Sequence, residues 1–279
     1  MQKRVDFYTT IDISCVYEHT PSGSLPTIRD STKLGVFLFP EEYMNNESRK
    51  NFVKHPIKTA ILVDGGFYRK RSKSLWGNKS PIDRANELND YCYKHLQDKY
   101  ENRYLYRIFY YDCPPISKNI YNPITQKTVS LEKTPDHAWM SEFLKELKHH
   151  RKFALRMGRI SDTQVHYSLK HEPTKKLLRG DILPADLTID DLELNLEQKG
   201  VDMRIGIDIS SLAFKHQVNQ IILISGDSDF VPAAKQARRE GIDFILDPMR
   251  APIKDDLFEH IDGIRTPNLY PTGAHTKNS

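Results

Sequence analysis

The fold is decided by residues 221–230, which read Ile-Ile-Leu-Ile-Ser-Gly-Asp-Ser-Asp-Phe. Four consecutive apolar residues followed by Ser-Gly predict a buried parallel strand that ends abruptly. Residues 230–240 predict a helix, because Pro232 falls in its first turn, where proline is tolerated. In open α/β sheets the turn from such a strand into a helix lies at the carboxyl edge, where ligands bind. Asp227 and Asp229 are therefore expected close together at that edge.

Two acids and a serine in front of a helix also have an ordinary explanation. Ser and Asp are favoured helix-capping residues, and acids in a first turn offset the helix dipole. Capping alone explains an isolated Ser-Gly-Asp-Ser-Asp at least as well as a carboxylate site does. The rest of the chain has to decide between the two.

Two further apolar runs also end at an acid. Residues 59–63 (Thr-Ala-Ile-Leu-Val) stop at Asp64 and two glycines, a turn that lets the backbone approach a ligand closely. Residues 104–111 stop at Asp112, followed by Cys-Pro-Pro. Asp64 is the stronger candidate. Asp112 could lie at the rim of the same site, but an acid that begins a proline turn needs no catalytic role.

A helical pattern opens after Lys-Gly-Val-Asp at 199–202. Asp202 can cap this helix or face the site. Asp208 lies six residues on, about 240° around the helix from Asp202. It can pair with Arg204 one turn back, so it is a secondary candidate.

Residues 67–76 interleave four cations with three aromatic side chains, reading Phe-Tyr-Arg-Lys-Arg-Ser-Lys-Ser-Leu-Trp. Cations neutralise phosphates and aromatic faces stack on unpaired bases, so this composition suits single-stranded nucleic acid. The alternative is a solvated loop that leads into an amphipathic helix. The candidate substrate-binding residues are Arg69, Lys70, Arg71, Lys73 and Trp76. Lys199 and Ser225 are candidates for phosphate contact or for supporting the acids.

Bulk composition excludes several classes of protein. The chain has 279 residues, 41 basic against 37 acidic, and a net charge of +4, which allows nucleic-acid binding without arguing for it. Three cysteines without metal-type spacing indicate a reduced, cytoplasmic protein. The absence of an apolar run near 18 residues and of a signal-peptide pattern indicates neither membrane insertion nor secretion.

The alternation of strand and helix patterns predicts one α/β domain with a right-handed parallel sheet. Short strands are also expected at 5–8 and 35–39, in a segment that carries no interpretable motif and could bind a protein partner or a second copy of the chain. The expected parts are an N-terminal extension and linker (1–55), the main domain (56–265) with an insertion at about 113–199 that could form a lid or substrate wall, and a polar tail (266–279).

Three motifs together resemble the NYN domain of the PIN-like nuclease superfamily, and within it the LabA-like branch. They are Asp64 at a first strand end, Lys-Gly-Val-Asp at 199–202 and Ser-Gly-Asp-Ser-Asp-Phe at 225–230, in matching order and spacing between Ile57 and Ile264. The resemblance implies a Rossmann-like three-layer α/β/α sandwich and a Mg²⁺- or Mn²⁺-dependent ribonuclease. It assigns catalytic and metal-binding roles to Asp64, Asp202, Asp227 and Asp229, with Asp208 as a secondary metal ligand. Many relatives have Asn soon after the first Asp, whereas here Gly-Phe-Tyr follows at 66–68.

Physical chemistry supports this reading independently. Carboxylates that converge in one cleft repel each other by roughly 4 kcal/mol per close pair at an effective dielectric near 20. A divalent cation would neutralise them, and oxygen-only ligands favour Mg²⁺ or Mn²⁺ over Zn²⁺. The expected reaction is metal-assisted, in-line hydrolysis of an RNA phosphodiester without a covalent protein intermediate.

Two other functions remain open from the sequence. One is a catalytically weak NYN module that binds RNA or regulates a partner. The other is a haloacid-dehalogenase-like phosphatase, which needs Asp-x-Asp at the first strand, where this chain reads Asp-Gly-Gly. A dinucleotide-binding enzyme is disfavoured because there is no Gly-x-Gly-x-x-Gly after that strand. A serine hydrolase is disfavoured because Ser225 is not in a Gly-x-Ser-x-Gly turn.

Overall fold

The computed structural model describes residues 55–99, 101–161 and 165–270. All of these described residues belong to one compact unit. The strands expected at 5–8 and 35–39 lie outside the described residues, as does the end of the polar tail.

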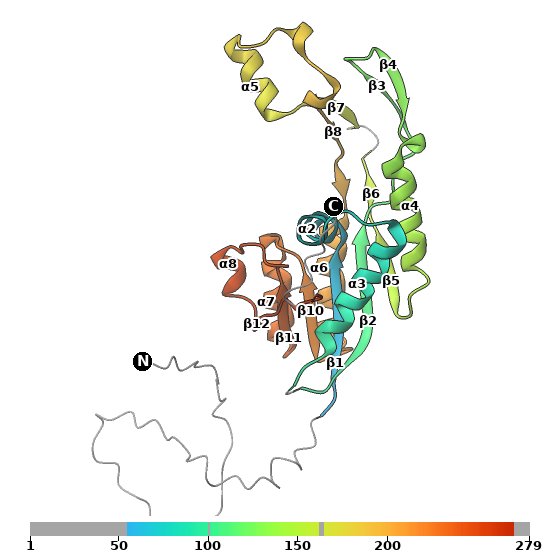
Figure 1. Ribbon diagram of the computed structural model, residues 1–279. Coiled ribbons are helices and arrows are strands. Elements are labelled where there is room, and N and C mark those ends of the chain that lie inside the picture. The colour runs from blue at the N-terminus through green and yellow to red at the C-terminus, as the bar shows by residue number, and fades with distance from the viewer. Residues whose placement is uncertain (1–54, 100, 162–164, 271–279) are drawn as a thin grey trace, which may run out of the picture. The chain divides into compact units, whose positions relative to one another are not determined.

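The centre of the molecule is a six-stranded sheet in which every neighbouring pair of strands is parallel (Figure 1). The spatial order is β12-β11-β10-β1-β2-β5. The bounds are β1 (Ile57–Asp64), β2 (Arg103–Asp112), β5 (Phe153–Met157), β10 (Gln220–Ile224), β11 (Asp243–Asp247) and β12 (Gly263–Ile264). The middle of β1 and all of β10 are buried, as their continuous apolar runs predict.

Helices cover both faces of this sheet. One layer contains α2 (Gly65–Trp76), α3 (Pro81–Leu96) and α4 (Pro135–Leu147), and the other contains α6 (Val201–Phe214), α7 (Val231–Arg239) and α8 (Asp255–Phe258). Successive strand residues point to opposite faces, so Ile61 packs in the first layer and Leu62 in the second. This confirms the predicted α/β/α sandwich with a mainly parallel sheet.

Local sequence explains where the helices begin. Before α3, the side chain of Ser80 accepts a hydrogen bond from the amide of Asp83, and Pro81 occupies the first helical position. Thr134 and Pro135 play the same parts at the start of α4. Within the described residues, no helix has the length and apolar character needed to cross a bilayer.

The predicted insertion is interrupted in the structure, because α4 and β5 belong to the central domain. The strand expected at 153–160 also breaks at Gly158, where a Cβ atom would lie 2.8 Å from the carbonyl oxygen of Lys199. The remaining elements are β3 (Asn119–Asn122), β4 (Lys127–Ser130), η2 (Leu131–Lys133), β6 (Arg159–Ile160), β7 (His166–Leu169), α5 (His171–Arg179), η4 (Pro184–Asp186), η5 (Ile189–Asp191), β8 (Leu192–Asn195) and β9 (Gln198–Lys199). The strands among them form three antiparallel pairs, β3 with β4, β6 with β9 and β7 with β8, and several of their apolar side chains contribute to a small separate core.

Strands β1 and β10 define where a ligand would bind. They are neighbours in the sheet, yet β1 leads into α2 on one face and β10 leads towards α7 on the other. Such a reversal opens a crevice at the carboxyl edge of a doubly wound sheet. Because Val63 pairs with Ile224, the next residues along, Asp64 and Ser225, meet at this point.

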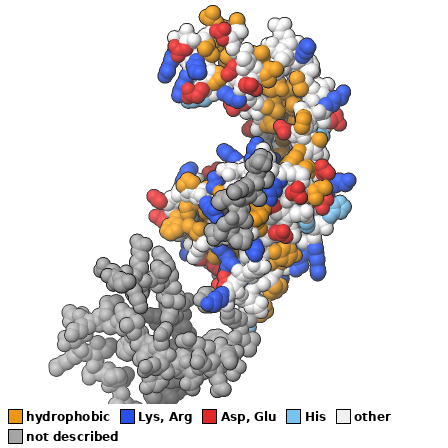
Figure 2. All heavy atoms as spheres, in the orientation of Figure 1, with side chains coloured by type: hydrophobic (Ala, Val, Ile, Leu, Met, Phe, Trp, Pro, Cys, Tyr) orange, Lys and Arg blue, Asp and Glu red, His pale blue; other side chains and the backbone are white. Residues whose placement is uncertain are grey.

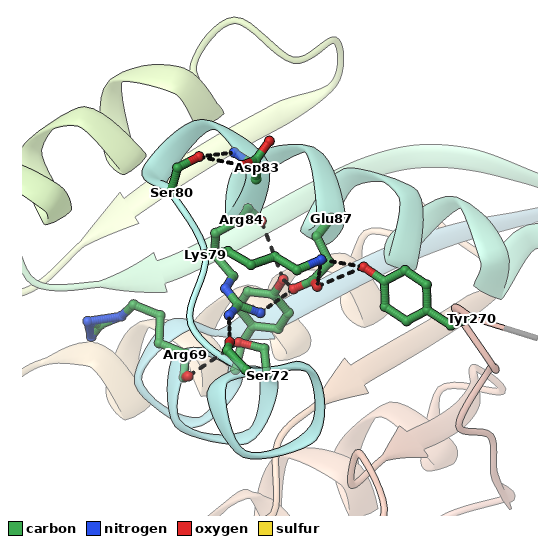
Figure 3. A network of polar contacts seen from close by, with 10 residues as sticks. Arg69, Ser72, Lys79, Ser80, Asp83, Arg84, Glu87 and Tyr270 are labelled. Atoms are coloured by element: carbon green, nitrogen blue, oxygen red, sulfur yellow. Dashed lines mark hydrogen bonds and ion pairs between the residues drawn. The ribbon is translucent and has the colours of Figure 1, made fainter. Parts of the chain in front are cut away.

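A buried network fixes α2 against α3 (Figure 3). Glu87 of α3 accepts hydrogen bonds from Tyr68 of α2 (3.2 Å) and from Tyr270 (3.1 Å), and it forms ion pairs with Arg84 and with Lys79 (2.8 Å). A buried carboxylate is tolerated when it is paired in this way. The basic and aromatic residues 67–76 therefore all lie in helix α2, which packs against α3, and none of them is in a loop.

Candidate active site

Asp64 is held by two hydrogen bonds at the end of β1. Its Oδ1 accepts from the amide of Phe67 (3.1 Å), which caps α2, and its Oδ2 accepts from Ser225 Oγ (3.2 Å). Burial raises the pKa of the Asp64 carboxyl. The two hydrogen bonds lower it in part, and the charges of Asp202 and Asp112 raise it again. Asp64 is thus a fixed carboxylate in a crowded, negatively charged place.

The turn after β10 carries the next two acids. Ser225 Oγ accepts from the amide of Asp227 (3.3 Å), and Asp227 Oδ1 accepts from the amide of Asp229 (3.0 Å) and so caps η6 (Ser228–Phe230). Both carboxylates are nevertheless exposed. Asp227 can thus cap η6 and still present its carboxylate to a ligand. A Cβ atom on Gly226 would lie 2.8 Å from the Phe67 ring, so this turn packs directly on the start of α2.

Asp202 joins the group from a third element, the first turn of α6. Burial raises the pKa of its carboxyl, and the charges of Asp227 and Asp229 raise it further. Charge repulsion falls with distance, so the carboxylates that act on Asp202, and Asp202 on Asp64, lie near one another. The four acids that the sequence singled out therefore lie at one edge of the sheet, contributed by β1, α6 and the turn after β10.

The four acids are neighbours without forming a coordination sphere. Among the described residues, no group of three or more His, Cys, Asp and Glu side chains is arranged to hold a metal ion. Their chemistry nevertheless fits a hard cation, because every donor is a carboxylate oxygen. The residues present match Mg²⁺ or Mn²⁺ by type.

Asp208 is engaged elsewhere. Its Oδ2 accepts from Tyr111 Oη (2.9 Å) and from Arg156 Nε (3.1 Å), on β2 and β5. The predicted pairing of Asp208 with Arg204 is wrong, because Arg204 donates to the carbonyl of Gly200 (3.2 Å). Asp208 is also not among the acids that raise the pKa of Asp64 or Asp202.

The cations and aromatics of α2 have divided roles. Arg71 donates twice to the carbonyl of Met249 (2.8 and 3.2 Å), which fixes the loop after β11. Trp76 is half-buried and packs edge-on against Tyr91, with ring centroids 5.2 Å apart. Lys70 and Lys73 are exposed. Arg71 and Trp76 thus make contacts within the protein, whereas Lys70 and Lys73 remain on the surface.

Lys199 and Ser225 also differ from each other. Lys199 is exposed, forms an ion pair with Glu197 (3.3 Å), and lies three residues before Asp202. Ser225 is fully buried, so its hydroxyl supports Asp64 and Asp227 instead of reaching a phosphate.

Sequence reasoning undervalued Asp112 and did not single out Gln198. Asp112 is buried at the end of β2 and forms an ion pair with Arg69. Gln198, in β9, lies beside the site, since a Cβ atom on Gly66 would be 3.9 Å from its Oε1. The apolar strand before Asp112 was the signal for a buried acid, whereas nothing around Gln198 distinguishes it from a loop residue.

The NYN domain family matches residues 141–255, which is less than half of the chain. NYN domains are in general nucleases, which indicates a hydrolase at a coarse level. The matched segment includes Asp202, Asp227 and Asp229, and it leaves Asp64 outside.

Other comparisons add little. A crystal structure of a protein of unknown function from Vibrio parahaemolyticus is similar at 15% sequence identity and a TM-score of 0.39, covering 75% of this chain and 92% of that chain. This likeness carries no information on function. No curated protein matches the chain.

Proposed function

We propose that this protein is a metal-dependent ribonuclease and that Asp64, Asp202, Asp227 and Asp229 are its catalytic acids. The observation that supports this most is that β1, α6 and the turn after β10, which are far apart in sequence, bring these four acids to one edge of the sheet. Helix capping accounts for Asp227 and in part for Asp64, but it does not require Asp202 to lie beside them. Cys92 and Cys113 are buried free thiols, which is compatible with the cytoplasmic location we propose.

The chain's own residues prepare this crevice for a cation and a phosphate. Ser225 and the amide of Phe67 fix the Asp64 carboxylate, while Asp227 and Asp229 remain exposed. A bound Mg²⁺ or Mn²⁺ would neutralise the acids, bind a phosphate oxygen and lower the pKa of an attacking water. Burial and, to a smaller extent, the charges of neighbouring acids raise the pKa values of Asp64 and Asp202, so a cation that compensates their negative charge would be favourable.

Single-stranded RNA is the proposed substrate. On the face shown in Figure 2, Lys and Arg side chains are interspersed with Asp and Glu, so attraction of a polyanion would be local. The exposed cations Lys70 and Lys73 lie on α2, which Asp64 caps, and exposed Lys199 lies in β9, three residues before Asp202. A haloacid-dehalogenase-like phosphatase is less suitable, because Gly66 stands where its second acid would be.

Asp227→Asn tests the assignment. Loss of charge from an exposed ligand should reduce RNA cleavage in Mn²⁺ by at least about 100-fold, the usual scale for an essential charged group at a reacting centre. Melting temperature should stay unchanged, since Asn can still cap η6. Asp208→Asn is the matched control and should cleave normally.

The cleavage assay uses end-labelled RNA with Mn²⁺, Mg²⁺ or EDTA. Unimpaired cleavage by Asp227→Asn would remove this residue from the site. Binding of RNA by the unmodified chain without cleavage in either metal would instead favour the module that only binds RNA or regulates a partner.

A further inference from the structure

Asp112 has its hydrogen-bonding capacity filled from within the protein. It is 1% exposed, and its Oδ2 accepts from Tyr110 Oη (2.8 Å) while its Oδ1 accepts from the amide of Cys113 (2.8 Å). Arg69 reaches both oxygens at 3.0 Å. A carboxylate so fully paired is poorly placed to bind a metal ion. Its effect is to hold the Arg69 guanidinium in one place.

The first turns of α2 explain how Arg69 reaches that place. A Cβ atom on Gly65 would lie 2.5 Å from Asp112 Oδ2, so only glycine lets the helix start this close to the end of β2. Arg69 is four residues after Gly65 and therefore on the same side of the helix, one turn on. Asp64 caps the same helix. One helix start thus positions both a site carboxylate and a guanidinium.

The Arg69 guanidinium retains unused hydrogen-bond donors. Its terminal NH1 has only the thioether sulfur of Met140 at 3.6 Å, a weak acceptor, and its Nε has no partner. The side chain is 28% exposed. Figure 3 shows it directed away from the network around Glu87. The Arg69 guanidinium is largely removed from water, and only its NH2 group has a strong hydrogen-bond acceptor within the described residues.

The positive charge of Arg69 favours an anion as the missing acceptor. Burial disfavours the charged form of Arg69, but the nearby carboxylates of Asp112 and Asp64 help to raise its pKa above the ordinary value, so the guanidinium stays charged. Its planar fork matches the geometry of a phosphate, which a lysine ammonium does not. By contrast, the donors of Arg71 are committed to a backbone carbonyl.

We propose that Arg69 binds a phosphate of the RNA at the edge of the acid cluster and that Asp112 is the positioning residue that aims it. The nature of the ligand rests on the proposed function. A purely structural Arg69–Asp112 pair would tie α2 to β2, and its loss would affect stability without affecting RNA affinity.

The test compares Arg69→Gln, Arg69→Lys and the control Lys145→Gln, which removes an exposed cation from the last turn of α4. Binding of a labelled single-stranded oligoribonucleotide is measured with Mn²⁺ in the cleavage-deficient Asp227→Asn background. Arg69→Gln should weaken binding by about 10- to 100-fold, the scale of a charged hydrogen bond. Arg69→Lys should recover only part of this loss, and Lys145→Gln should stay within about threefold, as expected of one exposed charge.

Asp112→Asn gives a second readout. Because Asp112 acts through Arg69, the effects of Asp112→Asn and Arg69→Gln on RNA affinity should be less than additive in the double variant. Melting temperatures of all variants establish that affinity is compared between folded proteins.

The outcomes separate this proposal from the nuclease assignment. Equal RNA affinity of folded Arg69→Gln and Lys145→Gln overturns the role of Arg69, whether or not the unmodified chain cleaves RNA. RNA binding that depends on Arg69, in a chain that does not cleave with Mn²⁺, supports the role of Arg69 and overturns the nuclease. Failure of the Asp227→Asn and unmodified proteins to bind RNA overturns both.

Discussion

Ser225 Oγ joins the two strand ends of the site in a single atom. It donates to Asp64 Oδ2 and accepts from the amide of Asp227, and the serine is completely buried. A sequence can place Ser225 before a turn, but it cannot reveal which strand end the hydroxyl will meet. That depends on β1 and β10 being neighbours, although 161 residues separate Asp64 from Ser225.

Ser225→Ala should therefore weaken the site while preserving the fold. Loss of a hydrogen bond that orients a ligating carboxylate typically costs about 10- to 100-fold in metal affinity or activity. Titration with Mn²⁺ and the kcat/KM for RNA measure the effect. Ser210→Ala is a suitable control, since Ser210 Oγ bonds only to the carbonyl of Gly206 in its own helix. Unchanged Mn²⁺ affinity in Ser225→Ala would argue against Asp64 as a ligand.

At the scale of elements, strand ends were easier to predict than insertions. The apolar runs that became β1 and β10 are short, uninterrupted and followed by turn residues, which favours buried strands. The run at 153–160 is half-buried and basic, and its break at Gly158 depends on close approach of the Lys199 carbonyl. Such tertiary proximity leaves no local pattern. For the same reason, the sequence predicts one continuous insertion, whereas the structure interrupts it at α4 and β5.

The tight start of α2 makes an element-scale prediction. Gly65→Ala would place a methyl group 2.5 Å from Asp112 Oδ2 and from Tyr110, and should destabilise the protein by about 1–3 kcal/mol. Gly206→Ala is the control, because a Cβ atom there meets nothing within 4 Å and alanine favours the helix by about 0.5–1 kcal/mol. Urea unfolding of both variants measures the difference. Equal stability would mean that α2 can shift away from β2 at little cost.

At the scale of the whole molecule, bringing the four acids together at one edge of the sheet is expected to lower the free energy of unfolding. Its four members come from segments that only the complete sheet brings together, so their convergence follows from the strand order. The sequence indicated each acid by its place at a strand or helix end. It could not show that Asp112 would be paired with Arg69 behind them, because an acid before two prolines is equally common in an exposed turn. The cost of this arrangement should appear in global unfolding.

Asp64→Asn should stabilise the metal-free protein at neutral pH. Because the folded-state pKa of Asp64 is raised above its ordinary value of 3.8, the folded protein holds this proton more tightly than the unfolded chain does. The stability due to Asp64 is thus fully present below pH 3.8 and is lost as the pH rises through the raised value. Asn keeps the cap on α2 without the charge. The advantage of Asp64→Asn should therefore grow between pH 4 and 7 in urea unfolding with EDTA. Saturating Mn²⁺ should raise the free energy of unfolding of the unmodified protein more than that of Asp64→Asn, so that the unmodified protein becomes the more stable of the two. If Asp64→Asn stays more stable in Mn²⁺, the cation does not bind at Asp64.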